Sequence, residues 1–245
     1  MVLKHEYKNI FINYEFFEGG KTLLVFLHGW GSNLNLMKPL AKNIVGDYSY
    51  LLIDFPPFGD SQEPKTPWNL NDYVVLTKEI IKNTENAYNF CSIILFGHSF
   101  GGRVAIKLAS LKPKKLEKLV LFASAGLKPK FSLKTKFKIA LYKHYKKTGN
   151  PKMKNFGSPD YKVLSPIMKQ TFNNVISEDL ASNCKQISCN TLIVFGNKDT
   201  ETPLYMGKRM KRLIKNSFLY VVNEGDHFAY IKNIQTILPV VLQFL

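Results

Sequence analysis

A serine between two glycines is the first feature of this chain that could carry chemistry. Residues 97–101 read Gly-His-Ser-Phe-Gly, with Ser99 at the centre. The pattern G-x-S-x-G is short and occurs by chance in unrelated chains. Here, however, it follows the apolar run at residues 92–96 and precedes helical spacing at residues 102–111. A serine on a sharp turn between a strand and a helix projects its hydroxyl into a cleft above the helix N-terminus. We therefore predict that Ser99 is a nucleophile.

A serine hydroxyl needs a base, and the base needs an orienting acid. Among the five histidines, His227 follows the last predicted strand, where a loop at the carboxyl edge of a sheet could bring it to the serine. Asp199 follows the strand pattern that ends at Phe195, and Glu201 is its nearby competitor. The chain order Ser–Asp–His is one of the known orders of such triads. We predict a triad that uses Asp199 and His227.

The loop after the first buried strand could stabilise a developing oxyanion. Residues 27–31 read Leu-His-Gly-Trp-Gly. We predict that the backbone N–H groups of Trp30 and Phe100 form an oxyanion hole, in which such donors stabilise a tetrahedral intermediate. We also expect the side chains of Trp30 and His28 to contact substrate. The alternative is a tight glycine turn with a core tryptophan.

Strand and helix patterns alternate along most of the chain. Apolar runs typical of buried strands alternate with helical spacing at these places: strands at residues 22–27, 48–55, 92–96, 119–123, 191–195 and 218–222, and helices at residues 34–45, 102–111, 203–214 and 231–245. A further helix, capped by Asn69 or Asn71, is predicted from the apolar stripe Tyr73, Leu76, Ile80 and Ile81. This order predicts an α/β fold with a mostly parallel central sheet flanked by helices. A further strand at residues 10–17 ends at Gly19 and Gly20, which predict a hairpin turn.

One stretch interrupts the alternation. Between Gly126 and Ser188 the sequence has helical signals but no convincing strand. We predict a single domain, with a core at 1–126 and 189–245 and a helical lid at 127–188. Within the lid, Phe131 and Tyr142 are predicted substrate contacts. They belong to an apolar set that could line a medium-length acyl pocket or only pack the lid on the core: Phe131, Phe137, Ile139, Leu141, Tyr142, Phe156, Tyr161, Ile167, Met168 and Phe172.

Composition places the chain among soluble globular proteins. It has 245 residues, of which 45% are hydrophobic, and three cysteines without metal-type spacing. The first residues lack the apolar stretch of a signal peptide, and no apolar run is long enough to span a bilayer. We expect a cytoplasmic protein that uses no metal and no organic cofactor.

The charge is strongly basic. Lys and Arg number 34 against 18 Asp and Glu, a net charge of +16, and Glu117 is the only acidic residue between Lys112 and Lys154. A second basic cluster lies at residues 208–215. Either a lysine-rich genome produces solvated faces, or an anionic partner or substrate meets this surface. A membrane surface is possible but not favoured, and nucleic acid is disfavoured because no basic motif with interleaved aromatic residues is visible.

Five motifs occur in an order that resembles the α/β-hydrolase superfamily: His28-Gly-Trp-Gly, Asp54-Phe-Pro-Pro-Phe-Gly-Asp-Ser, Gly97-His-Ser-Phe-Gly-Gly, Gly196-Asn-Lys-Asp and Gly225-Asp-His. The resemblance covers nearly the whole chain except the lid. Pro57 stands where glycine is common, which alters a loop but removes no catalytic group. Serine at the elbow argues against haloalkane dehalogenases and epoxide hydrolases, which use aspartate there.

The run His-Gly-Trp-Gly-Ser-Asn with a short lid looks most like the pimeloyl-acyl-carrier-protein methyl ester esterases, and also resembles small carboxylesterases and meta-cleavage C–C hydrolases. The resemblance implies cleavage of a carboxylic ester through an acyl-enzyme, and an acidic acyl carrier protein would suit the lysine-rich lid. The alternatives are C–C bond hydrolysis, general carboxylesterase or lipase-like activity on short to medium acyl chains, and a scaffold that only binds a partner.

Overall fold

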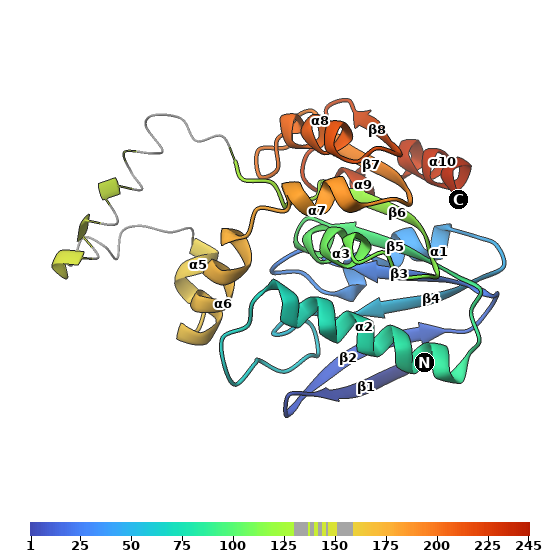
Figure 1. Ribbon diagram of the computed structural model, residues 1–245, viewed down its shortest axis with the longest axis horizontal. Helices are drawn as coiled ribbons and strands as arrows, with labels where there is room; N and C mark the ends of the chain where they lie inside the picture. Colours follow the sequence, from blue (N-terminus) through green and yellow to red (C-terminus); the bar gives the residue numbers. More distant parts are fainter. Residues whose placement is uncertain (130–136, 138–139, 142–143, 146, 151–158) are drawn as a thin grey trace.

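The computed structural model describes residues 1–129, 137, 140–141, 144–145, 147–150 and 159–245. Its centre is an eight-stranded sheet with the strand order β1-β2-β4-β3-β5-β6-β7-β8 (Figure 1). All pairs from β4 to β8 are parallel, and only β1 and β2 run antiparallel to their neighbours. The predicted α/β fold with a mostly parallel sheet is confirmed.

The six parallel strands lie where the apolar runs predict them, with bounds that differ by a few residues: β3 (Thr22–Leu27), β4 (Tyr48–Ile53), β5 (Ser92–His98), β6 (Leu116–Phe122), β7 (Asn190–Gly196) and β8 (Ser217–Val222). Parallel strands connected by helices are covered on both faces, which is why they read as continuous apolar runs. Their carboxyl ends all face one edge of the sheet, so the loops that follow β3, β5, β6, β7 and β8 meet there.

The antiparallel hairpin at the sheet edge differs from the sequence prediction. The hairpin joins β1 (Val2–Tyr7) to β2 (Ile10–Phe17), and its turn residues Lys8 and Asn9 both have positive φ. The predicted turn at Gly19 and Gly20 was wrong, because β2 pairs with β4 and not with β3. These two glycines serve a close crossing instead: a Cβ on Gly20 would lie 1.8 Å from the Asp47 carbonyl oxygen.

Helices cover both faces of the sheet (Figure 1). One face carries four helices whose buried side chains share a core: α2 (Leu70–Ala87), α3 (Phe100–Ser110), α7 (Ala181–Gln186) and α8 (Leu204–Leu213). The other face packs against a second core with η1 (Leu34–Leu36), α1 (Lys38–Asn43), α9 (Ala229–Lys232) and α10 (Ile234–Phe244). This is the three-layer arrangement that a mostly parallel sheet requires.

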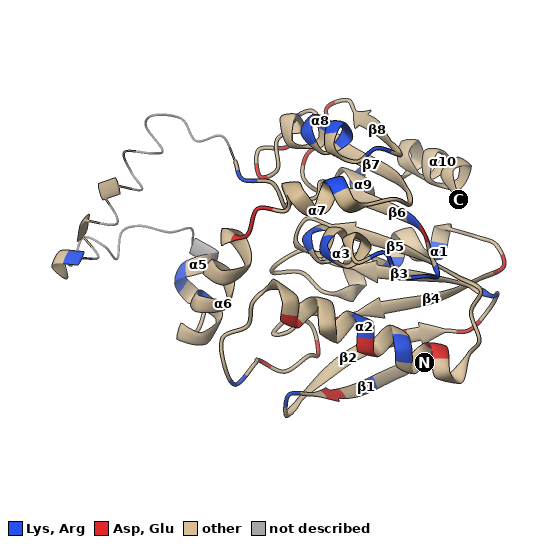
Figure 2. Ribbon diagram, viewed as in Figure 1, with Lys and Arg blue, Asp and Glu red and all other residues tan. Residues whose placement is uncertain are grey.

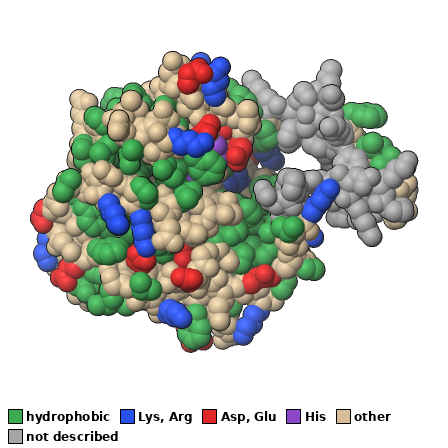
Figure 3. All heavy atoms as spheres, turned by 180° about the vertical axis from the view of Figure 1, so that it is seen from behind, with side chains coloured by type: hydrophobic (Ala, Val, Ile, Leu, Met, Phe, Trp, Pro, Cys, Tyr) green, Lys and Arg blue, Asp and Glu red, His purple; other side chains and the backbone are tan. Residues whose placement is uncertain are grey.

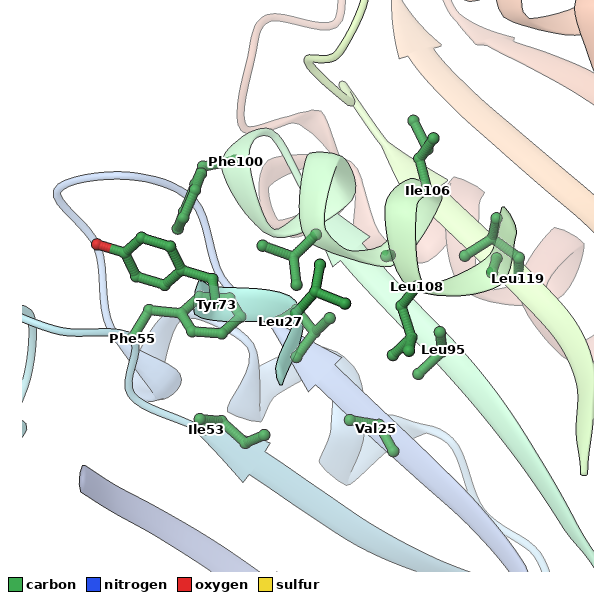
Figure 4. Close-up of a cluster of buried hydrophobic side chains, with 14 of the residues drawn as sticks. Val25, Leu27, Ile53, Phe55, Tyr73, Leu95, Phe100, Ile106, Leu108 and Leu119 are labelled. Carbon is green, nitrogen blue, oxygen red and sulfur yellow. The ribbon is translucent and has the colours of Figure 1, made fainter. Parts of the chain in front are cut away.

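An aromatic cluster supports the first turn of α3. Figure 4 shows the rings of Phe55, Tyr73 and Phe100 gathered above the strand residues Leu27 and Ile53. The Tyr73 ring lies 4.9 Å from that of Phe100 and 5.6 Å from that of Phe55, both edge-to-face. Such pairs stabilise beyond the area they bury. The cluster therefore holds the start of α3 firmly on the sheet.

The segment between β6 and β7 contains α5 (Pro159–Val163), α6 (Pro166–Ser177) and α7. Figure 1 shows α5 and α6 to one side of the sheet, whereas α7 packs on α3 and α8 with Cys184 buried. Phe131 and Tyr142, predicted as substrate contacts, lie outside the described residues. No helix in the described ranges is both long and apolar enough to cross a bilayer.

Candidate active site

Ser99 lies at the sharp turn between β5 and α3. Its backbone has φ 49° and ψ −109°, a conformation that L-residues rarely adopt and that costs of order 1–3 kcal/mol. Three backbone hydrogen bonds hold it: Ser99 N–H donates to the Phe122 carbonyl (3.1 Å), and the Ser99 carbonyl accepts from Arg103 N–H (3.3 Å) and Ala125 N–H (3.1 Å). The turn is thus tied both to β6 and to the loop after it.

Glycine is required where this turn crosses β3. A Cβ on Gly101 would lie 2.0 Å from the Leu27 carbonyl oxygen, and one on Gly97 would lie 2.7 Å from Cα of Gly102. Strand and helix can approach this closely only without side chains at these positions. The spacing of the pentapeptide therefore has a steric cause.

Asp199 and His227 form a direct hydrogen bond. The Nδ1 atom of His227 lies 2.9 Å from Oδ2 of Asp199, and both residues are buried. The carboxylate also receives the N–H groups of Glu201 (2.8 Å) and Thr202 (2.9 Å) on Oδ1. Burial alone raises the pKa of Asp199, but the bonds from His227 and Thr202 outweigh it and the pKa lies below its ordinary value. An ionised Asp199 holds the proton of His227 on Nδ1 and leaves Nε2 as a base.

Glu201 lies on the opposite side of the same imidazole. Its Oε2 atom is 3.5 Å from Nε2 of His227, and its side chain is 65% exposed. The sequence prediction chose Asp199 over its competitor Glu201 for the role of orienting acid. The structure places them at different ring nitrogens, with the buried carboxylate of Asp199 at Nδ1.

His98 fixes the loop that carries His227. Its Nε2–H donates to the His227 carbonyl oxygen at 3.0 Å, and the two rings lie 4.9 Å apart. Burial and the neighbouring His227 lower the pKa of His98 to about 3, so it stays neutral at physiological pH. A neutral ring supports His227 without adding a second positive charge.

His28 does not contact the cavity, contrary to the prediction that it binds substrate. The ring is fully buried: Nε2 accepts the Phe55 N–H at 2.8 Å, and Nδ1–H donates to the Gly29 carbonyl at 2.8 Å. Burial lowers the pKa of His28 to about 4. With both ring nitrogens bonded to backbone, His28 shapes the loop after β3, whereas Trp30 lines the cavity.

Ser99 and His227 line one cavity of about 320 Å³ at the carboxyl edge of the sheet. The cavity walls come from the loops after β3, β5, β6, β7 and β8 and from α5 and α6: Gly29, Trp30, Ser32, His98, Ser99, Phe100, Arg103, Ala125, Tyr161, Leu164, Phe172, Val175, Ile176, Glu201, Thr202, His227 and Phe228. Loops that follow parallel strands meet at this edge, which explains why residues so distant in sequence converge. A cavity of this volume suits a small ligand.

Trp30 lies between the core and α6. Its ring contacts Phe100 at 5.3 Å and Phe172 of α6 at 5.2 Å, measured between ring centroids. Within the described part of the chain, no acceptor receives the backbone N–H of Trp30 or of Phe100. Two such donors beside a serine hydroxyl are of the kind that could stabilise an oxyanion.

Several wall residues were not predicted from the sequence. Tyr161 and Phe172 belonged to the apolar lid set, but Leu164, Val175, Ile176 and Phe228 did not. Arg103 was also missed, although its place one helical turn after the nucleophile puts it on the face of α3 that carries Ser99. Its charge made it resemble one more surface cation in a basic chain.

Comparison with known proteins identifies the family. Residues 22–156, more than half of the chain, match the family model described as alpha/beta hydrolase fold. The chain belongs to the α/β-hydrolase family. This α/β hydrolase therefore carries its serine, aspartate and histidine at the strand ends where the fold gathers loops.

Two curated relatives cover nearly all of this α/β hydrolase. It is 26% identical to a 2-hydroxy-6-oxononadienedioate/2-hydroxy-6-oxononatrienedioate hydrolase of Pseudomonas putida, covering 92% of this chain and 88% of the relative. It is also 26% identical to a pimeloyl-[acyl-carrier protein] methyl ester esterase of Legionella pneumophila, covering 91% and 94%. Among solved structures, an esterase from Exiguobacterium antarcticum superposes with a TM-score of 0.75 at 21% identity, over 96% of this chain and 95% of that chain.

Proposed function

We propose that this α/β hydrolase cleaves a carboxylic ester through an acyl-enzyme, with Ser99, His227 and Asp199 as its triad. The observation that carries the proposal is the 2.9 Å bond between Asp199 and Nδ1 of His227, beside a cavity that His227 shares with Ser99. A serine, a histidine and an aspartate arranged in this way are the groups that acyl transfer requires.

In the acylation step, Ser99 Oγ attacks the ester carbonyl carbon while Nε2 of His227 takes the hydroxyl proton. The negative charge develops on the carbonyl oxygen, where the N–H groups of Trp30 and Phe100 stabilise it by about 3 kcal/mol each. Asp199 stabilises the imidazolium. The carbon–oxygen bond to the alcohol then breaks, and His227 returns its proton to the departing alcohol.

In the deacylation step, a water molecule replaces the alcohol. His227 takes a proton from the water, the hydroxide attacks the acyl carbon, and the bond to Ser99 Oγ breaks as the serine regains a proton from the imidazolium. The products are a carboxylic acid and an alcohol, and the triad returns to its starting state.

A methyl ester on an acyl carrier protein is the more specific substrate that we propose. The relative from Legionella pneumophila is named for this reaction. The basic surface supports it, because carrier proteins are acidic and long-range attraction accelerates the encounter of opposite charges. In the described part, Figure 2 shows Lys and Arg positions coloured along the ribbon of α8, which carries Lys208, Arg209, Lys211 and Arg212. The lid lysines between residues 130 and 158 lie largely outside the described residues.

Hydrolysis of a C–C bond is the second candidate. It is favoured by the relative from Pseudomonas putida, whose name describes a dienedioate hydrolase and which the chain matches over nearly its full length. The same triad would serve a vinylogous diketone. The two candidates differ in substrate and not in the residues that the cavity brings together.

The test combines labelling with a substrate panel. A fluorophosphonate probe is expected to label the wild-type protein, and Ser99→Ala is expected to lose the label and at least about a thousandfold of kcat. The panel contains methyl esters of increasing acyl length, free and linked to an acyl carrier protein, and a meta-cleavage ring-fission product. Turnover of the ring-fission product without ester hydrolysis would select the second candidate.

Asp199 and Glu201 provide a matched pair of variants. We expect Asp199→Asn to lower kcat about 10³- to 10⁴-fold, because an amide cannot hold the required tautomer of His227. Glu201→Gln is expected to change kcat less than about fivefold, since an exposed ion pair contributes little. Equal losses in the two variants, or none in Asp199→Asn, would contradict the assigned triad.

A further inference from the structure

Arg103 is a buried cation in the wall of the catalytic cavity. It lies on the first turns of α3, is only 6% exposed, and lines the cavity together with Ser99. Charged side chains are rarely buried to this degree unless an opposite charge accompanies them. The groups that surround Arg103 therefore indicate its role.

No carboxylate of the described residues pairs with Arg103. The nearest acidic groups are engaged elsewhere: both oxygens of Glu178 bind Lys107 Nζ at 2.8 and 3.0 Å, and Asp179 Oδ1 accepts the Ala181 N–H at 3.2 Å. Burial lowers the pKa of Arg103 to about 10, against the opposing effect of Glu178 and Asp179. At neutral pH the guanidinium is thus charged, desolvated and without a carboxylate partner.

Only part of the guanidinium is satisfied by the protein. Nη2 donates to the carbonyl oxygens of Val175, at 2.7 Å, and of Glu178, at the end of α6. Nε is buried and has no hydrogen-bond partner among the described groups. A buried donor without an acceptor is destabilising, and more so on a charged group, unless a ligand accepts its hydrogen bond.

The cavity offers room for such a ligand and an orientation for it. Arg103 contributes the buried positive charge of the wall, whereas Glu201 lies beside Nε2 of His227. An anionic group on a substrate is therefore attracted to Arg103 and repelled from the side of Glu201. The anionic group of the substrate then lies towards Arg103, while the ester carbonyl lies at Ser99.

We propose that Arg103 binds a carboxylate, or a similar anionic group, on the acyl part of the substrate, so that among free, carrier-independent esters this hydrolase prefers half-esters of dicarboxylic acids. The inference rests on the proposed ester hydrolysis and specifies its substrate class. Arg103 acts in it as a specificity-determining residue. Hydrogen bonds from its Nη2 atom to the end of α6 hold the guanidinium in the cavity wall.

The test compares monomethyl esters of straight-chain dicarboxylic acids, from succinic to suberic acid, with methyl esters of monocarboxylic acids of the same length. We expect kcat/KM of the wild type to favour the best half-ester at least about tenfold, as charge-assisted hydrogen bonds do. Arg103→Gln is expected to remove this preference and to leave neutral esters less affected. Lys107→Met is the control, because it removes the ion pair with the Glu178 carboxylate near the end of α6 but outside the cavity, and it is expected to keep the preference.

Binding supplies a readout independent of turnover. Calorimetry on Ser99→Ala protein is expected to show that the monomethyl ester binds more tightly than its neutral counterpart, and that Ser99→Ala combined with Arg103→Gln loses this difference. Thermal unfolding checks that each variant is folded, and Arg103→Lys provides a second variant that keeps the charge. Equal binding of both esters, or an equal loss in Arg103→Gln for both, would show a purely structural arginine and overturn the proposal. Absence of ester turnover together with selective binding would instead contradict only the proposed reaction.

Discussion

At the scale of single residues, the loops that carry His227 and Trp30 rest on histidines that stay neutral. The His98 ring packs between His227 and Tyr230 and donates to the His227 carbonyl, while His28 bonds only to backbone. Burial lowers the pKa of His98 to about 3 and that of His28 to about 4, from an ordinary 6.5. Below pH 6.5 the unfolded chain takes up protons at these positions and the folded chain does not.

The folded protein is therefore expected to lose stability as the pH falls from 6.5 towards 4. Each histidine contributes up to about 1.4 kcal/mol per pH unit to the fall in the free energy of unfolding. His98→Gln, which keeps an N–H donor for the His227 carbonyl, should reduce this slope. Urea unfolding at a series of pH values measures it, with His144→Gln at an exposed position as the control. A slope that falls equally in both variants would contradict this role of His98.

At the scale of elements, the junction of β5 and α3 is what places Ser99 in the cavity wall. The close crossing over the end of β3 aims the serine hydroxyl into the cavity, and the aromatic cluster of Phe55, Tyr73 and Phe100 holds the helix in place. A residue with φ of 49° persists only where its surroundings fix it in this way.

A methyl group at the crossing is expected to disrupt the junction. Gly101→Ala places a Cβ 2.0 Å from the Leu27 carbonyl oxygen, so the helix must move, at a cost of about 3 kcal/mol or more. Gly31→Ala is the control, because its φ is 73° but nothing lies within 4 Å of the added Cβ, and it should cost about 1–2 kcal/mol. Denaturant midpoints compare the two variants. A Gly101→Ala protein as stable as Gly31→Ala would show that the crossing is not tight.

At the scale of the whole molecule, the +16 net charge is unevenly distributed. On the face seen in Figure 3, basic side chains are interspersed with acidic ones. The ribbon of α8 in Figure 2 carries several basic positions, of which Lys208, Lys211 and Arg212 are exposed. An acidic carrier protein would be attracted to a basic surface such as that of α8. Attraction between exposed charges is screened within about 8 Å at physiological ionic strength.

Salt should therefore separate carrier-linked from free esters. We expect kcat/KM for an ester on an acyl carrier protein to fall several-fold as salt is added, and kcat/KM for the free methyl ester to change little. The double variant Lys208→Glu, Lys211→Glu on α8 should lower only the first value. Parallel salt dependence for both esters would indicate that the basic surface meets no carrier.

The sequence by itself determined the fold class and indicated which side chains could carry chemistry. Buried parallel strands must be continuously apolar, and the glycines around Ser99 follow from one steric crossing, so both are visible as local patterns. The order of serine, aspartate and histidine could be read in the same way, because each follows a strand end.

Only the tertiary structure decided what depends on neighbours distant in the chain. It places Asp199 at Nδ1 of His227 and Glu201 at Nε2. It also shows that His28 bonds to backbone away from the cavity, and that the hairpin turn lies between β1 and β2 and not at Gly19 and Gly20. It also separated Arg103 from the other cations of a lysine-rich chain. Burial and the pairing of a charge depend on packing between elements, and no local pattern of residue types encodes them.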